Sequence, residues 1–139
     1  MKRFFLLTLA SAALLGASAA PVKTYEVKSP DGRLALVLTA GERLSFTVAR
    51  DGETLVAPSE MALTLSTGEV LGESPRVRSA RRRAVSETID APLYRQSRFD
   101  AAYNELDLRL RGDYGILARA YDDGVCYRFY TERDGELTI

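Results

Sequence analysis

The stretch NELDLRLRGDYGILARAYDDGVCYRF, residues 104–129, decides the predicted fold. Leucine occupies every second position from Leu106 to Leu110, and apolar residues alternate with others again from Val125 to Phe129. A period of two places each apolar set on one face of a strand, as half-buried antiparallel strands require. Two turn sequences, Gly112-Asp113 and Asp122-Asp123-Gly124, separate the runs. The stretch therefore predicts consecutive strands joined by short hairpins.

The same pattern continues towards the N-terminus. Apolar residues alternate from Leu44 to Val48, and Asp51-Gly52 predicts a two-residue hairpin between residues 43–50 and 53–56. The run Leu34–Leu38 is apolar on both faces, which predicts a central strand. Further turn signals stand at Asp31-Gly32 and Asp134-Gly135. Short strands with turns at this spacing and no convincing helix predict an all-β fold, an antiparallel β-sandwich.

Two segments are less regular. Residues 76–90, which include Arg81-Arg82-Arg83, have few apolar residues and predict a long exposed or edge strand that ends by Pro92. Residues 94–102 predict an irregular connection into a strand that begins near Tyr103. Residues 136–139 begin another strand, so we expect a truncated chain and a sandwich that is incomplete at its C-terminus.

The first twenty residues have the character of an export signal. Basic residues precede the apolar run Phe4–Leu15, and Ala17 and Ala19 fit an A-x-A cleavage site. We expect residues 1–19 to be a signal peptide and residues 20–139 to be an exported domain, periplasmic or secreted. A retained anchor is the alternative, although the run is shorter than the about 20 apolar residues that span a bilayer.

Composition excludes several function classes. Removing the predicted signal peptide lowers Lys+Arg from 19 to 17 against 19 Asp+Glu, which argues against nucleic acid or an anionic membrane as partner. The chain has no His, so it has no His general base and no His metal ligand. Cys126 is the single cysteine and cannot form an intrachain disulfide; we expect a buried, inert thiol.

Four segments together resemble the N-terminal domain of glycoside hydrolase family 97. They are Ser29–Gly32, Ser86–Ile89, Tyr103–Leu106 and Arg119–Phe129, and the likeness runs over about residues 27–129. The motif residues, which we expect to be structural, are Tyr103, Asn104, Glu105, Asp122, Asp123, Gly124, Tyr127 and Arg128. Where many members of the family carry a basic or His-containing segment, this chain has Asp100-Ala101-Ala102.

The resemblance implies a galactose-mutarotase-like β-sandwich at the front of a bacterial enzyme that acts on α-linked sugars. Such α-glucosidases and α-galactosidases have a catalytic (β/α)8 barrel, depend on calcium, and use glutamate or aspartate carboxylates for catalysis. By this resemblance the catalytic residues, and a glutamate near the calcium, lie beyond Ile139. We therefore carry over no catalytic residue and no metal ligand, and we expect calcium only in the full-length enzyme.

Some side chains nevertheless suggest chemistry. Glu105 could act as a glycosidase acid, but it has no obvious partner, and we expect a carboxylate that binds loop backbone at a strand entrance. Asp122, Asp123 and Glu132 could form a calcium cluster, although two acids before a glycine are more typical of a turn.

Basic and aromatic residues also have alternative readings. Arg81-Arg82-Arg83 could bind phosphate or an acidic partner, but a solvated edge strand fits the nearly neutral charge better. Tyr121, Tyr127 and Tyr130 could form a sugar platform or could pack in the core.

Two functions remain open on the sequence. The first is a non-catalytic, carbohydrate-contacting or structural N-terminal domain of a secreted α-glycosidase, with the barrel of the same protein and an α-linked oligosaccharide as partners. The alternative is a stand-alone secreted β-sandwich that binds a glycan or a protein.

Overall fold

A computed structural model describes residues 21–90, 98–135 and 137–139. The predicted signal peptide, Pro92 and residues 94–97 lie outside these ranges. Within them every regular element is a strand, and no helix has the length and apolar character needed to cross a membrane. The strands are β1 (Lys23–Lys28), β2 (Leu34–Ala40), β3 (Leu44–Arg50), β4 (Glu53–Glu60), β5 (Leu63–Thr64), β6 (Val70–Leu71), β7 (Val77–Asp90), β8 (Arg98–Leu110), β9 (Tyr114–Ala120) and β10 (Val125–Thr131).

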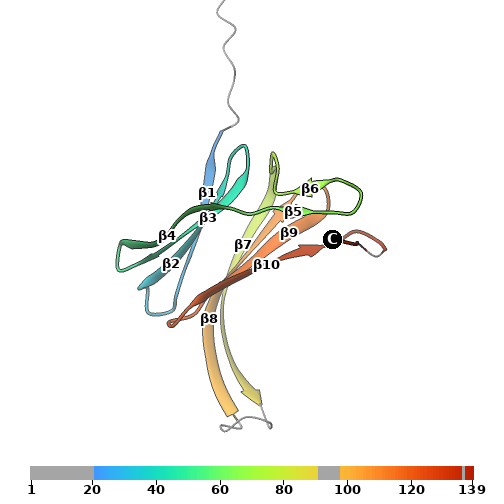
Figure 1. Ribbon diagram of the computed structural model, residues 1–139. Helices are drawn as coiled ribbons and strands as arrows, with labels where there is room; N and C mark the ends of the chain where they lie inside the picture. The colour runs from blue at the N-terminus through green and yellow to red at the C-terminus, as the bar shows by residue number, and fades with distance from the viewer. Residues whose placement is uncertain (1–20, 91–97, 136) are drawn as a thin grey trace, which may run out of the picture.

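Two four-stranded antiparallel sheets make the body of the domain. One has the order β1-β2-β3-β4 and the other β10-β9-β8-β7, with β5-β6 as a short separate pair. Figure 1 shows them as two layers, blue to green and yellow to red, with β5 and β6 beside the upper part of the second layer. The prediction of an all-β antiparallel sandwich is confirmed.

Leucines from both sheets fill the space between the layers. In β2 the buried positions alternate from Leu34 to Leu38, and in β8 they alternate from Leu106 to Leu110. These residues belong to one apolar cluster that includes Ile116 of β9. Because β2 has β1 on one side and β3 on the other, it is the central strand that its two apolar faces predicted.

The hairpins form where turn chemistry placed them. Arg50 pairs with Glu53, and the residues between them, Asp51 and Gly52, have φ angles of 51° and 86°. Two consecutive positive φ angles define the tight hairpin turn whose twist matches the flanking strands. After β9 the Asp122-Asp123-Gly124 turn leads into β10, and the Tyr121 amide donates to the Gly124 carbonyl at 2.8 Å. Both predicted hairpins are therefore confirmed.

The predicted start of one strand was wrong. Strand β8 begins at Arg98 rather than near Tyr103, because it stays paired with β7 over residues 98–102 through contacts between polar side chains. Thr88 donates to Asp100 at 2.8 Å, and Arg98 pairs with Asp90 at 3.0 Å. Such pairs have no apolar period and so escape a search for alternating hydrophobic residues.

The end of the chain differs from its prediction as well. Residues 137–139 form no strand, whereas residue 136 lies outside the described ranges. The segment is nevertheless held in place, since Leu137 packs against the core and the Ser66 amide donates to the Thr138 carbonyl at 2.8 Å. The edge position predicted for the arginine-rich strand is confirmed, because β7 ends its sheet.

We predict that Gly72→Ala strongly destabilises the domain. Gly72 has a φ of 97°, and a Cβ there would collide with the Met61 carbonyl. Strained backbone costs about 1–3 kcal/mol, and the collision adds to it, so we expect a loss of roughly 2–4 kcal/mol in denaturant unfolding.

Gly68→Ala is the matched control. Gly68 has a similar φ of 86°, but its added Cβ would meet nothing within 4 Å. This variant should lose only about 1 kcal/mol, from the left-handed backbone alone. Equal losses in the two variants would contradict a close backbone approach at Gly72.

Candidate functional site

The outer face of the β7–β10 sheet carries a polar network that includes two of the motif residues, Tyr103 and Glu105. Because Leu106 and Leu108 point into the core, Glu105 and Asp107 point away from it. The strand register then sets Arg83 of β7 on one side of Glu105 and Arg119 of β9 on the other. Residues that are far apart in sequence thus meet around one carboxylate.

Glu105 is a buried carboxylate held between two guanidinium groups. Its residue is only 3% exposed; Arg83 Nε donates to Oε1 at 2.5 Å and Arg119 Nε donates to Oε2 at 2.8 Å. Burial alone would raise the pKa of the Glu105 carboxyl, but the two arginine hydrogen bonds outweigh it and hold this pKa below its ordinary value. Glu105 is therefore an ionised, fully engaged group.

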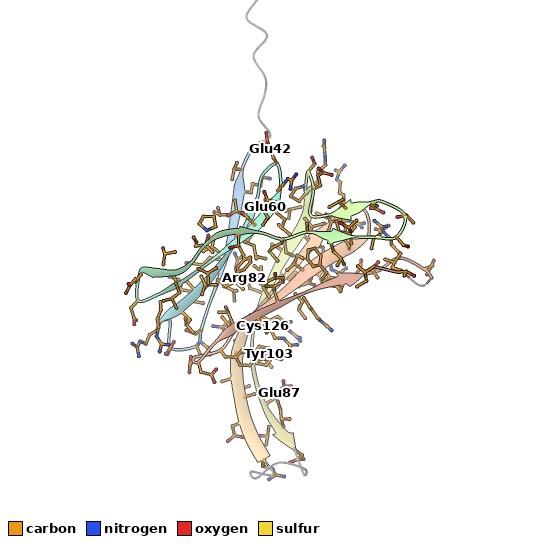
Figure 2. All side chains as sticks on the ribbon, in the orientation of Figure 1. Glu42, Glu60, Arg82, Glu87, Tyr103 and Cys126 are labelled. Carbon is orange, nitrogen blue, oxygen red and sulfur yellow. The ribbon has the colours of Figure 1, made fainter. Side chains whose placement is uncertain are left out.

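Tyr103 extends this network to the part of β8 that pairs with β7 and no longer with β9. The Arg119 guanidinium lies 4.6 Å from the centroid of the Tyr103 ring, and the Tyr121 ring centroid lies 4.9 Å from it. The Tyr103 hydroxyl donates to Glu87 Oε1 at 3.2 Å. Figure 2 shows Tyr103 where the sheet narrows to β7 and β8, with Glu87 farther along that pair. Burial raises the pKa of Tyr103, so the phenol stays a donor at neutral pH.

A second polar group follows along the same face. The Tyr130 hydroxyl donates to Asp107 Oδ1 at 2.5 Å, and Arg109 pairs with Asp107 at 3.4 Å and with Glu132 at 3.0 Å. Burial, together with the hydrogen bond to Asp107, raises the pKa of Tyr130 to about 12. The Asp107 and Glu132 carboxylates are thus both bound by neighbouring side chains on this face.

Three polar contacts join the two sheets beside β1. Asn104 Nδ2 donates to the Lys28 carbonyl at 2.8 Å, and Arg82 Nε donates to the Glu26 carbonyl at 3.0 Å. The Asp31 amide donates to Asp122 Oδ1 at 2.9 Å. The sequence predicts Arg82 as part of a solvated edge strand, and only the strand register, which pairs it with Leu106, shows that it faces the other sheet.

The remaining motif residues lie at the β9–β10 end. Asp123 and Arg128 are exposed, and Tyr127 faces the other sheet, where its ring centroid lies 5.2 Å from that of Phe46. Tyr127 is still 40% exposed because β10 is an edge strand. Since Tyr121 and Tyr130 lie on the opposite face, no single platform unites the three tyrosines.

Two expectations about single side chains were wrong. Cys126 is exposed rather than buried, because it occupies the outward parity of an edge strand. Glu105 binds two arginine side chains in mid-strand, not loop backbone at a strand entrance. In both cases the neighbouring strand, which local sequence does not reveal, decides the environment.

Glu105 and Asp107 are the two carboxylates of this face that could form a catalytic pair. They share one strand face two residues apart, about 6–7 Å along the strand, which is a separation that glycosidase carboxyl pairs use. Glycosidase acids, however, need a raised pKa, whereas the pKa of Glu105 is lowered. A lowered pKa is the opposite of what a general acid needs, so Glu105 does not fit that role.

The described residues also do not fit a calcium ion. In residues 21–90, 98–135 and 137–139, no three acidic side chains lie together as a metal site requires. Asp122 accepts the Asp31 amide, and Glu132 pairs with Arg109, so the suggested cluster is divided between two other roles.

One small cavity lies away from this face. Its volume is about 260 Å³, and its lining includes Arg43, Glu60, Met61, Thr64, Val70 and Gly72. Glu60 is paired with Arg43 at 2.9 Å, so this carboxylate too is engaged. Figure 2 shows Glu60 at the top of the sandwich, far from Tyr103.

Comparison with known proteins places this architecture in context. The glycosyl-hydrolase 97 N-terminal family model matches residues 27–139. A retaining alpha-galactosidase of Bacteroides thetaiotaomicron is 37% identical over 110 residues, which is 79% of this chain and 17% of that protein.

Solved structures show the same fold. A glycoside hydrolase family 97 enzyme from Pseudoalteromonas sp. strain K8, in complex with acarbose, matches with a TM-score of 0.72 at 17% identity. A beta-arabinopyranosidase matches with a TM-score of 0.72 at 20% identity. Each match covers 80% of this chain and 18% of the solved chain, so the chain spans less than a fifth of these relatives.

We predict that Glu105→Gln destabilises the domain by roughly 2–3 kcal/mol in denaturant unfolding, because Arg119 and Arg83 lose their shared carboxylate. Glu60→Gln is the control, since it removes an ion pair whose partners are 58% and 63% exposed. Such a surface pair contributes at most about 1 kcal/mol. Losses of equal size would contradict a buried role for Glu105.

Acid unfolding gives a second prediction for Glu105. Its folded pKa lies below the ordinary value of 4.5, so its stabilisation is complete above that value. The stabilisation is lost as pH falls from there through the folded pKa. Stability measured from pH 6 down to about pH 2 should therefore fall less steeply in Glu105→Gln than in the wild type. Parallel curves would contradict the lowered pKa.

Proposed function

The chain belongs to the N-terminal domain family of glycoside hydrolase 97, and we propose that it is the non-catalytic front domain of a secreted α-glycosidase. The match to the family model over most of the chain carries the proposal. Because the chain covers only 17% of the retaining alpha-galactosidase that it resembles, the hydrolytic activity is proposed for the whole protein. The bonds cleaved are α-galactosidic or α-glucosidic.

The chemistry of the domain supports a role without catalysis. Glycoside hydrolysis needs one carboxyl group to give up a proton and a second to act as nucleophile or base. Glu105 is clamped by Arg83 and Arg119, and Asp107 is bound by Tyr130 and Arg109. These bonds engage both carboxylates, and the two arginines hold the pKa of the Glu105 carboxyl below its ordinary value. We therefore assign the acid and its partner to the catalytic barrel of the same protein.

The domain then acts as a rigid support beside that barrel. Contacts from Arg82, Asn104 and Asp122 hold the two sheets together. A support of this kind fixes the barrel and the sugar-binding loops that surround it, and preorganised geometry is a large part of catalytic rate. Contact with an α-linked oligosaccharide is part of the proposal, at the border with the barrel.

Calcium and export complete the proposal. Family resemblance supports a calcium ion in the full-length enzyme, but the described residues offer no ligand set, so we place no ligand in them. The N-terminal residues 1–19 have the charge, apolar run and small residues of a signal peptide, which supports a periplasmic or secreted protein.

We predict that the purified 139-residue chain hydrolyses neither an aryl α-galactoside nor an aryl α-glucoside, with or without added calcium. The longer polypeptide that carries this domain and a barrel should hydrolyse at least one of them. Release of the aryl group, followed by absorbance, measures both. Robust turnover by the short chain would overturn the proposal.

Binding experiments on the short chain test the alternative function. Three results together would favour a stand-alone glycan-binding module. The short chain would be a monomer that unfolds cooperatively, it would bind an α-linked oligosaccharide in calorimetry, and its gene would encode no barrel. Absence of binding together with activity of the longer polypeptide supports the front-domain proposal.

A further inference from the structure

The small cavity beside β5 and β6 is built on a fixed backbone. Gly72 lines it, and the Gly72 amide donates to the Tyr114 hydroxyl at 3.2 Å, whereas the Gly72 carbonyl accepts the Leu44 amide at 2.8 Å. The Met61 amide in turn donates to the Leu44 carbonyl at 2.8 Å. Because Leu44, Met61 and Tyr114 are buried, the floor of the cavity belongs to the core of the domain.

The backbone on one side of the cavity is held in an unusual conformation. Ser74 follows the lining residue Glu73 and has a φ of 45°, which side chains other than glycine rarely adopt. The Ser74 amide donates to the Glu42 carbonyl at 2.7 Å, and Glu73 forms a β-bridge with Arg43. Such strain persists only where the surrounding structure imposes it, and it is concentrated at binding sites. The strained turn fixes Glu73 next to Arg43.

Charged side chains of both signs line the cavity. Arg43 Nη1 donates to Glu60 Oε2 at 2.9 Å, whereas the Glu73 carboxylate forms no ion pair with any described residue. A guanidinium group has five N–H donors and a carboxylate has several acceptor positions, so both members of the ion pair retain hydrogen-bonding capacity. Figure 2 shows a further acid, Glu42, at the same end of the molecule as Glu60. The lining thus carries one positive and two negative groups.

This combination of charges selects the chemistry of a ligand. An anion would meet Glu60 and Glu73, and an apolar molecule would remove water from charged groups without replacing their hydrogen bonds. A calcium ion requires six to eight oxygen ligands and would be repelled by Arg43. A neutral molecule with several hydroxyl groups fits, because each hydroxyl can donate to a carboxylate and accept from the arginine. Its C–H groups can pack on Val70.

The volume of the cavity limits the size of that molecule. At about 260 Å³ it lies just below the range of about 300–1,000 Å³ that is typical of pockets for drug-sized ligands. It equals the space of roughly nine water molecules at about 30 Å³ each. This is room for one sugar ring, and the rest of an oligosaccharide would extend into solvent.

We propose that this cavity binds one neutral sugar unit, with Arg43 donating to its hydroxyls and Glu60 and Glu73 accepting from them. The inference goes beyond the proposed function, because the site is separate from the carboxylates that we assign to the barrel. None of the described residues that line the cavity is aromatic, so the sugar has no ring to stack on. We therefore expect weak binding, with a Kd of about 1 mM.

The experiment titrates the 139-residue chain with methyl α-galactoside and with methyl α-glucoside, and follows the backbone amides by NMR. Amides of residues 60–64 and 70–73 should shift with one of the two sugars. Arg43→Met removes the donors and keeps an unbranched side chain, so we expect the Kd to rise at least tenfold.

Arg33→Met is the matched control. Arg33 also pairs with a carboxylate, Asp51, at 2.8 Å, and the partners are 54% and 52% exposed, but neither lines the cavity. This variant should bind the sugar like the wild type. Denaturant unfolding of both variants shows that each remains folded.

Absence of shifts at residues 60–64 and 70–73, or equal weakening in the two variants, would overturn the proposal. Tighter binding of galacturonate or galactosamine than of the neutral sugar would also overturn it, because the ligand would then be an anion or a cation. In the longer polypeptide the sugar should slow hydrogen–deuterium exchange of residues 60–73, and the slowing should be absent in Arg43→Met. No slowing in the wild type would count against the site, since another part of the protein would then fill the cavity.

Activity measurements on the longer polypeptide separate this inference from the proposed function. If that polypeptide cleaves neither aryl α-galactoside nor aryl α-glucoside, the proposed function fails, whatever the cavity binds. If it cleaves one of them while residues 60–73 do not respond to sugar, only the cavity proposal fails.

Discussion

Burial of leucine at every second position of β2 and β8 is the constraint on which the rest of this domain depends. Leu36, Leu38, Leu106 and Leu108 are fully buried in one apolar cluster. A strand has a period of two, so a leucine that points inward obliges its neighbours to point outward. A slip of one residue in β8 would bury Glu105 and Asp107 in the core, and the register is therefore strongly specified.

The outward residues use this fixed register to build a closed polar network. Glu105 meets two arginines, and Asp107 meets Tyr130 and Arg109, so both outward carboxylates of this part of β8 are engaged. Burying such a network contributes little net stability, since desolvation offsets most of the attraction, but breaking one partner is costly. A face of this kind holds a fixed shape, which agrees with the supporting role that we propose for the domain.

The polar network around Glu105 and the outer part of the β7–β8 pair, residues 85–90 and 98–103, are two regions of one sheet with different properties. Around Glu105 every strand has neighbours and the polar groups are engaged. Beyond Tyr103 no third strand of the described residues pairs with β7 or β8, and Ile89 remains exposed on a mostly apolar face. The first region thus has its polar groups engaged by neighbouring strands, whereas the second has exposed apolar surface.

The sequence by itself determined the strands, their alternation and the Asp51-Gly52 hairpin, because period and turn chemistry are local properties of the chain. It also carried the family resemblance. Only the tertiary structure decided the partners of Glu105, which lie 22 and 14 residues away, and the exposure of Cys126. Likewise it decided that β8 starts at Arg98, since polar cross-strand pairs leave no hydrophobic period. Side-chain environment depends on which strand lies alongside, and that is settled only when the sheets assemble.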